Sequence, residues 1–124
     1  MAERSTIGKA GEDLAASYLE RLGWRIVDRN WRFSRVGEID IVAVEPSGGR
    51  GTLVFCEVKA RSGTGFGDPL ESITVGKLKR LHRLACAWMA THPTGFDQVR
   101  IDAIGVLSLP GGPATIDHVQ AVAL

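Results

Sequence analysis

Residues 52–61, TLVFCEVKAR, are the stretch that most narrows what this chain can fold into. The apolar run at 53–56 predicts a buried strand, yet Glu57, Lys59 and Arg61 then recur at every second position. Because side chains alternate across a strand, these three charged residues share one face. A strand face that carries both signs of charge is either a solvated edge or a site, and the other segments have to decide between the two.

The chain has 124 residues, of which 44% are hydrophobic and 23% charged, a composition typical of a globular domain with a real core. We expect one domain over 1–124, with a core at about 6–109 and a C-terminal strand at about 114–124. The formal net charge is only +1. Any argument for nucleic-acid binding must therefore rest on where the charges lie and not on their sum.

Cysteine usage and the N-terminus indicate the compartment. Cys56 and Cys86 each have apolar neighbours, which predicts small buried thiols in a reducing cytosol, and no Cys-x-x-Cys motif suggests zinc. The N-terminus is charged and has no apolar signal-peptide core, and no apolar run approaches the roughly 18–20 residues of a membrane span. We expect a cytoplasmic protein with no membrane partner.

Hydrophobic periodicity predicts an α/β chain in the order α-β-β-β-α-β-β. The three strands between the helices read as an antiparallel meander. Asp102, within RIDAI, is expected to be a structural acid paired with Arg100 or another arginine. The predicted helices span 6–22 and 75–91, and the predicted strands span 24–33, 36–45, 52–61, 98–109 and 114–124.

Strict alternation in the second strand places Ile39 and Ile41 on one face and Asp40, Val42 and Val44 on the other. Asp40 therefore shares a face with apolar residues. Taken alone, such an aspartate is compatible with an ordinary ion pair.

A hairpin between the second and third strands would set Asp40 opposite Glu57, if Val44 faces Leu53. Two carboxylates that face each other on a half-buried sheet destabilise it unless positive charge offsets them. Lys59, two residues along the same face, supplies one charge. A divalent cation supplies two, and hard oxygen ligands favour Mg²⁺ or Mn²⁺.

The first helix contributes a third acid. Glu12 falls beside Leu19 at the edge of the apolar arc, so it is predicted to face the sheet. An alternative is a boundary glutamate, favoured in the first helical turns by the helix dipole. The conjunction of Glu12 with Asp40, Glu57 and Lys59 favours a site. Such a set suits metal-assisted hydrolysis of a phosphodiester, in which the lysine orients water or stabilises charge developing on phosphate oxygens.

The motif GEID followed by EVK resembles the catalytic core of the PD-(D/E)XK nuclease superfamily, and the αβββαβ order is similar to its common core. More narrowly, the chain resembles the YraN-like family, which is related to Holliday-junction resolvases. The resemblance covers most of residues 8–106. It is carried by GKAGEDLAASYLERLGWRIVDRNWR, GEIDIVA, FCEVKAR, KLKRLHRLACAWM and RIDAIGV.

The resemblance implies a restriction-endonuclease-like fold, with a mixed central sheet flanked by helices. It implies that Asp40 and Glu57 bind Mg²⁺ or Mn²⁺, with the backbone carbonyl of Val58 as a further ligand and Glu12 acting through water. Lys59 would be the catalytic lysine. Ile39 departs from the pattern, since the superfamily motif has proline before its aspartate.

The segment KLKRLHR places basic side chains around the second helix. Together with Arg61, they are predicted to contact DNA phosphates, which would give salt-dependent affinity without sequence specificity. The alternative is a solvated basic face. The helical members of the predicted set are Lys77, Lys79, Arg80 and Arg83.

Three functional hypotheses follow. The first is a metal-dependent DNA endonuclease that acts on branched or repair intermediates. The second is a nucleic-acid-binding or complex-forming module that keeps the site with little or no catalysis, and the third is a structural domain with an ion-pair network. A homodimer would suit the cutting of two strands by two active sites, although no segment identifies a dimer surface.

Overall fold

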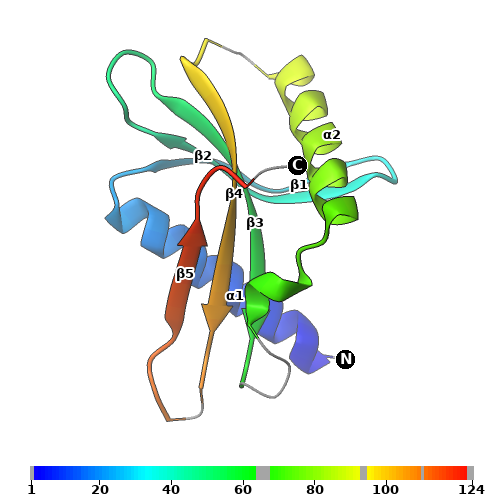
Figure 1. The fold of residues 1–124 in the computed structure, drawn as a ribbon, viewed down its shortest axis with the longest axis vertical. Helices are drawn as coiled ribbons and strands as arrows, with labels where there is room; N and C mark the ends of the chain where they lie inside the picture. The colour runs from blue at the N-terminus through cyan, green and yellow to red at the C-terminus, as the bar shows by residue number, and fades with distance from the viewer. Residues whose placement is uncertain (1, 64–67, 93–94, 110, 123–124) are drawn as a thin grey trace.

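The computed structural model describes residues 2–63, 68–92, 95–109 and 111–122 (Figure 1). Its five strands form one mixed sheet in the order β1-β2-β3-β4-β5, with the two α-helices on opposite faces. The predicted fold class, a central mixed sheet flanked by helices with a restriction-endonuclease-like core, is confirmed. The elements are α1 (Ala2–Arg21), β1 (Arg25–Phe33), β2 (Gly37–Glu45), β3 (Thr52–Arg61), the 3₁₀ helix η1 (Pro69–Ser72), α2 (Val75–Thr91), β4 (Gln98–Leu107) and β5 (Thr115–Val119).

The strand connections explain the topology. Strands β1, β2 and β3 form the predicted antiparallel meander. Helix α2 then carries the chain back across the sheet, so β4 runs parallel to β3, whereas β5 returns antiparallel to β4. The prediction that the last strand reaches residue 124 is wrong: β5 ends at Val119, and Ala121 has φ 53°. Residues 123–124 of that predicted strand lie outside the described residues.

Each face of the sheet has its own apolar core. On the α1 side, Ala15 and Leu19 pack against a layer that includes Cys56 and Ile104. On the α2 side, the layer includes Val42, Val44, Leu53 and Phe55, on which α2 places Leu81, Leu84, Ala85 and Trp88. The sheet is therefore buried on both faces at its centre, and a charged side chain there needs a compensating partner.

A close helix–strand contact fixes the position of α1. A Cβ atom added at Gly11 would lie 2.5 Å from the Cβ of Ala60 in β3. Real Cβ atoms do not approach so closely, which means that only glycine allows α1 to sit this near to β3. This contact brings the neighbouring residue, Glu12, to the edge of β2 and β3.

Asp102 anchors the far side of the sheet and is completely buried. Its carboxylate accepts hydrogen bonds from Arg100 Nε at 2.7 Å and from the Ala121 backbone N–H at 3.1 Å. His118 Nε2 lies 2.8 Å from the other carboxylate oxygen, and Tyr18 Oη lies 2.8 Å from His118 Nδ1. The expected structural pairing with Arg100 is confirmed, and the network also ties β5 and α1 to β4.

Candidate active site

The strand register that brings the acids together is the one expected. Val44 pairs with Leu53, and the antiparallel ladder continues as far as the pair of Ile41 and Cys56. One further step along both strands reaches Asp40 and Glu57. There the ladder gives way to a side-chain contact, since the backbone N–H of Val58 donates to Asp40 Oδ2 at 2.7 Å.

At Asp40 the side chains of β2 stop alternating regularly between the two faces of the sheet, so the predicted strict alternation is wrong at this point. Ile39 is buried in the α2-side core, whereas Ile41 is buried in the α1-side core. The neighbouring strand is irregular at the same level: Asn30, which lies between the partners of Ile41 and Ile39 in β1, adopts a left-handed φ of 52°. Trp31, the partner of Ile39, packs on the α2 side as well. Asp40 thus lies at a break between the two apolar faces.

Charge and burial act together on Asp40. Burial, followed by the negative charge of Glu57, raises the pKa of Asp40 to about 7 from its usual 3.8. Glu12 adds to this rise in pKa, while the hydrogen bond from Val58 and the charge of Lys59 oppose it. The three acids predicted from the sequence therefore influence one another across α1, β2 and β3.

Positive charge lies beside the acids. Lys59 Nζ is 3.4 Å from Glu57 Oε1, and the two side chains are only 26% and 14% exposed. Lys77 at the start of α2 donates from Nζ to the backbone carbonyl of Ser72 at 2.9 Å. The charge of Lys59 is the largest cause that lowers the pKa of Lys77, so the two ammonium groups lie close to each other.

Asn30 is a site residue that the sequence arguments missed. Its Nδ2 donates to Glu12 Oε1 at 2.6 Å, which holds that carboxylate at the break in the sheet. The available signal was an asparagine in the middle of an otherwise regular strand, because asparagine tolerates the left-handed region far better than apolar residues do.

The donor set fits a partly hydrated ion better than a closed metal cage. Within the described ranges, no group of three or more His, Cys, Asp or Glu side chains is arranged to hold a metal ion. Asp40 and Glu57 supply two carboxylates, and one Asp40 oxygen already accepts the Val58 N–H. Mg²⁺ commonly takes one or two carboxylates and fills its other positions with waters and substrate phosphates, which two acids can satisfy. The predicted roles of the Val58 carbonyl and of Glu12 stay predictions.

The basic residues predicted on α2 divide into two groups. Lys77 and Arg80 flank the sheet-facing side, and the Arg80 side chain lies against Gly37 of β2. Lys79 and Arg83 are exposed and, at 100° per residue, lie on the side away from the sheet. Of these four residues, Lys77 lies close enough to Lys59 and Glu57 for their charges to act on its pKa.

Arg61 follows Lys59 on the same strand face. Its Nη1 donates to the backbone carbonyl of Ala60 at 3.4 Å, and its Nε is buried without a hydrogen-bond partner. A buried donor of this kind is costly unless a ligand or water satisfies it.

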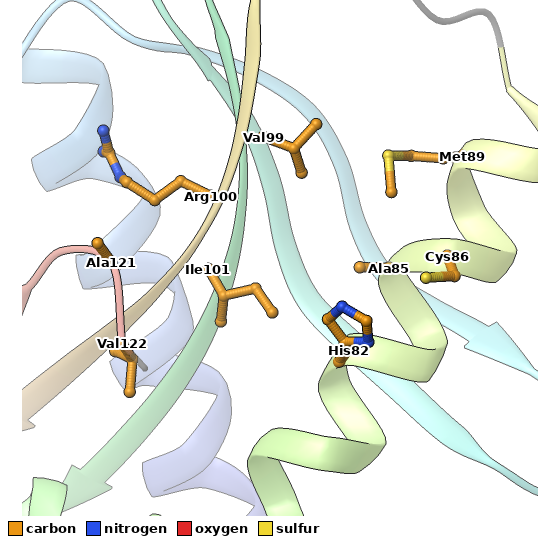
Figure 2. Close-up of a pocket in the computed structure, with 9 residues that line it drawn as sticks. All are labelled: His82, Ala85, Cys86, Met89, Val99, Arg100, Ile101, Ala121 and Val122. Carbon is orange, nitrogen blue, oxygen red and sulfur yellow. The ribbon is translucent and has the colours of Figure 1, made fainter. Parts of the chain in front are cut away.

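A groove of about 450 Å³ lies elsewhere, between α2 and β4 (Figure 2). His82, Cys86 and Met89 of α2 face Val99 of β4 across it, while the Arg100 side chain points away toward α1. None of the predicted catalytic residues lines this groove. Cys86 is exposed, so the expectation that both thiols are buried is wrong for this one, because its side chain borders the open groove.

The fold and the site together define a class: an α/β domain with a restriction-endonuclease-like core, in which two carboxylates and a lysine meet at a break in the sheet. Within that class, the chain belongs to the family described as "Uncharacterised protein family UPF0102", whose model matches residues 11–106. The sequence-based assignment to the YraN-like family is thereby confirmed at the family level.

Two relatives match nearly the whole chain. A UPF0102 protein of Arthrobacter sp. (strain FB24) is 45% identical over 98% of this chain and 99% of its own length. A UPF0102 protein of Nocardia farcinica is 42% identical over 98% of this chain and 92% of its own length. In the part of the chain that the structure describes, no helix has the length and apolar character needed to cross a membrane.

Proposed function

We propose that the protein is a metal-dependent endonuclease that hydrolyses phosphodiester bonds in DNA. One observation carries the proposal: Asp40 and Glu57 lie side by side, both partly buried, at a break in the sheet, with Lys59 in contact with Glu57. A structural role does not explain why two acids are buried together, because their mutual repulsion costs stability. A substrate-bound cation would remove that cost.

The side chains take distinct roles in this proposal. Asp40 and Glu57 would hold Mg²⁺ or Mn²⁺, which supplies Lewis-acid polarisation of a phosphoryl oxygen when it is bound. Lys59 points its ammonium at the same place and stabilises negative charge that develops on the phosphate. Glu12, fixed by Asn30, orients a water molecule beside the acids.

Contacts to DNA would come from the cations that surround the acids. Lys77 lies close to Lys59, and Arg80 lies against β2. Arg61 lies on the same strand face as Lys59. Its buried Nε, which has no hydrogen-bond partner, would donate to a phosphate oxygen. These contacts would recognise the phosphate backbone and not the bases. The substrate would therefore be selected by its shape, such as that of a branched or repair intermediate.

The test is cleavage of linear, flapped and four-way-junction DNA in Mg²⁺, in Mn²⁺ and in EDTA. Wild type is expected to cut in either metal and not in EDTA, with Asp40→Asn and Lys59→Ala each at least about 100-fold slower. Glu20→Gln, on the exposed side of α1, is the matched charge control and should cut at the wild-type rate.

A second function has its own supporting observation. No three acids converge on a metal position in the described residues, which suits a nucleic-acid-binding or complex-forming module with little or no catalysis. Salt-sensitive DNA binding by the wild type, with no cleavage of any of the three substrates, would favour this alternative and overturn the endonuclease proposal.

A further inference from the structure

A row of aromatic side chains runs from the α2-side core to the tip of the β1–β2 hairpin. His92 stacks on the buried Trp88, with ring centroids 4.0 Å apart and an interplanar angle of 5°. Trp31 meets His92 edge-on at 5.9 Å, and Phe33 stacks on Trp31 at 5.7 Å and 15°. Phe33 ends the row and is 40% exposed. A large ring is thus held rigidly at the surface.

The strand opposite Phe33 leaves room for a cation. Phe33 pairs with Gly37, and a Cβ atom at Gly37 would lie 3.5 Å from Arg80 Cδ and 3.6 Å from Arg80 Nε. Because directly opposite residues of an antiparallel pair point to the same face, the Phe33 ring and the Arg80 side chain lie on the same face of the hairpin. Arg32 and Arg35 of the same hairpin are exposed, and Arg32 also contacts Glu38 at 3.3 Å.

The hairpin tip is in line with the proposed active site. Asp40 follows Gly37 by three residues along β2, which is about 10 Å of strand. This length equals roughly three nucleotide steps of a stacked strand at about 3.4 Å each. Lys77 and Arg80 lie on the flank of α2 that faces this stretch. In Figure 1 the tip of the hairpin projects beyond α2.

We propose that Phe33, supported by Trp31, is a stacking platform for an unpaired base of a nucleic-acid strand whose phosphates run along Arg80 and Lys77 toward Asp40. Every base has a π-face, so an exposed, pre-ordered aromatic ring beside cations binds single strands without reading their sequence. The surplus of arginine around the ring favours a polyanion over an apolar protein partner. The direction of the strand toward Asp40 rests on the proposed nuclease function, whereas the stacking itself does not.

The experiment measures binding in EDTA, where no cleavage interferes. The probes are a splayed-arm DNA with 2-aminopurine in one unpaired arm and a fully paired duplex with the same number of phosphates. Phe33→Ala is expected to weaken splayed-arm binding about tenfold, to leave duplex binding unchanged and to abolish quenching of the 2-aminopurine emission. Phe33→Trp should keep both signals. Val27→Ala, an exposed apolar residue on the same strand, is the matched control and should behave as wild type.

A third substitution keeps the proposal falsifiable if alanine disturbs the hairpin. Phe33→Leu retains apolar bulk without an aromatic face, so it should lose quenching as Phe33→Ala does. Wild-type affinity and quenching in Phe33→Leu would overturn the proposal, and so would an equal loss of affinity for the duplex and the splayed arm in Phe33→Ala. Phe33-dependent binding by a protein that cuts no DNA would support the platform and defeat the endonuclease. DNA cleavage by the wild type, with no effect of Phe33→Ala on binding, would support the endonuclease and overturn the stacking platform.

Discussion

Replacing Asp40 by asparagine is expected to stabilise the metal-free protein. Asparagine can still accept the Val58 N–H through its side-chain oxygen, and it removes a buried negative charge beside Glu57. The rise in the pKa of Asp40 from 3.8 to about 7 sets the size of the effect, since each pKa unit corresponds to about 1.4 kcal/mol. The full effect at pH 8 is therefore on the order of 4 kcal/mol, an upper limit because the site can relax.

The direction of the pKa shift of Asp40 determines how the stability of the fold depends on pH. A folded-state pKa above the unfolded value means that the folded protein keeps a proton that the unfolded chain has lost. The contribution of Asp40 to stability is thus fully present below pH 3.8 and declines as the pH rises through about 7. Between pH 5 and pH 8, ionisation of Asp40 should lower the free energy of unfolding of the wild type by up to about 3 kcal/mol. Asp40→Asn should not lose this stability.

The assay is urea denaturation of both proteins at pH 5 and pH 8 in EDTA. The advantage of Asp40→Asn should grow with pH. Glu57→Gln should flatten the pH dependence of the wild type, because the charge of Glu57 is the second largest cause of the raised pKa. Glu20→Gln is the control and should change nothing. If the stability advantage of Asp40→Asn over the wild type were no larger at pH 8 than at pH 5, ionisation of Asp40 would not be what destabilises the metal-free fold.

Two further substitutions test the close contact of α1 with β3 and the buried network around Asp102. Gly11→Ala should destabilise the fold by about 1–3 kcal/mol because the new Cβ meets Ala60. Gly8→Ala, on the same helix, is the control: its Cβ meets nothing within 4 Å, so it should be neutral or stabilising. Equal melting temperatures for the two variants would contradict the close contact of α1 with β3. Asp102→Ala should cost about 1–3 kcal/mol by urea denaturation, because His118 and the Ala121 N–H lose their buried acceptor while Arg100 keeps Glu45. A loss below about 1 kcal/mol would show that the network contributes little.

The sequence predicted the architecture because its signals are local and strong. The periodicity of the helices and of the third strand gave α2 and β3 their bounds, and the shared apolar pattern of the hairpin gave its register. The break at Asp40 was not predictable in this way. It coincides with a left-handed residue, Asn30, in the neighbouring strand, and alternation within one strand contains no information about its partner.

The site was predictable in its acids and less so in its surroundings. Asp40, Glu57 and Glu12 were identified because acids at the edge of apolar faces conflict with simple burial. The division of the α2 cations into two faces follows from how the helix is rotated on the sheet, which tertiary packing decides. The buried state of His118 had no local signal, since it arises from Asp102 and Tyr18 on two distant elements.

Metal binding by the acid pair is tested by titrating the wild type with Mn²⁺ at pH 7, by calorimetry in two buffers of different ionisation enthalpy. We expect one saturable site per chain that releases about half a proton per ion, because Asp40 is half protonated when its pKa is about 7. Asp40→Asn should lose both the binding and the proton release. Absence of saturable binding, or unchanged binding in Asp40→Asn, would contradict the claim that this acid pair exists to hold a metal ion.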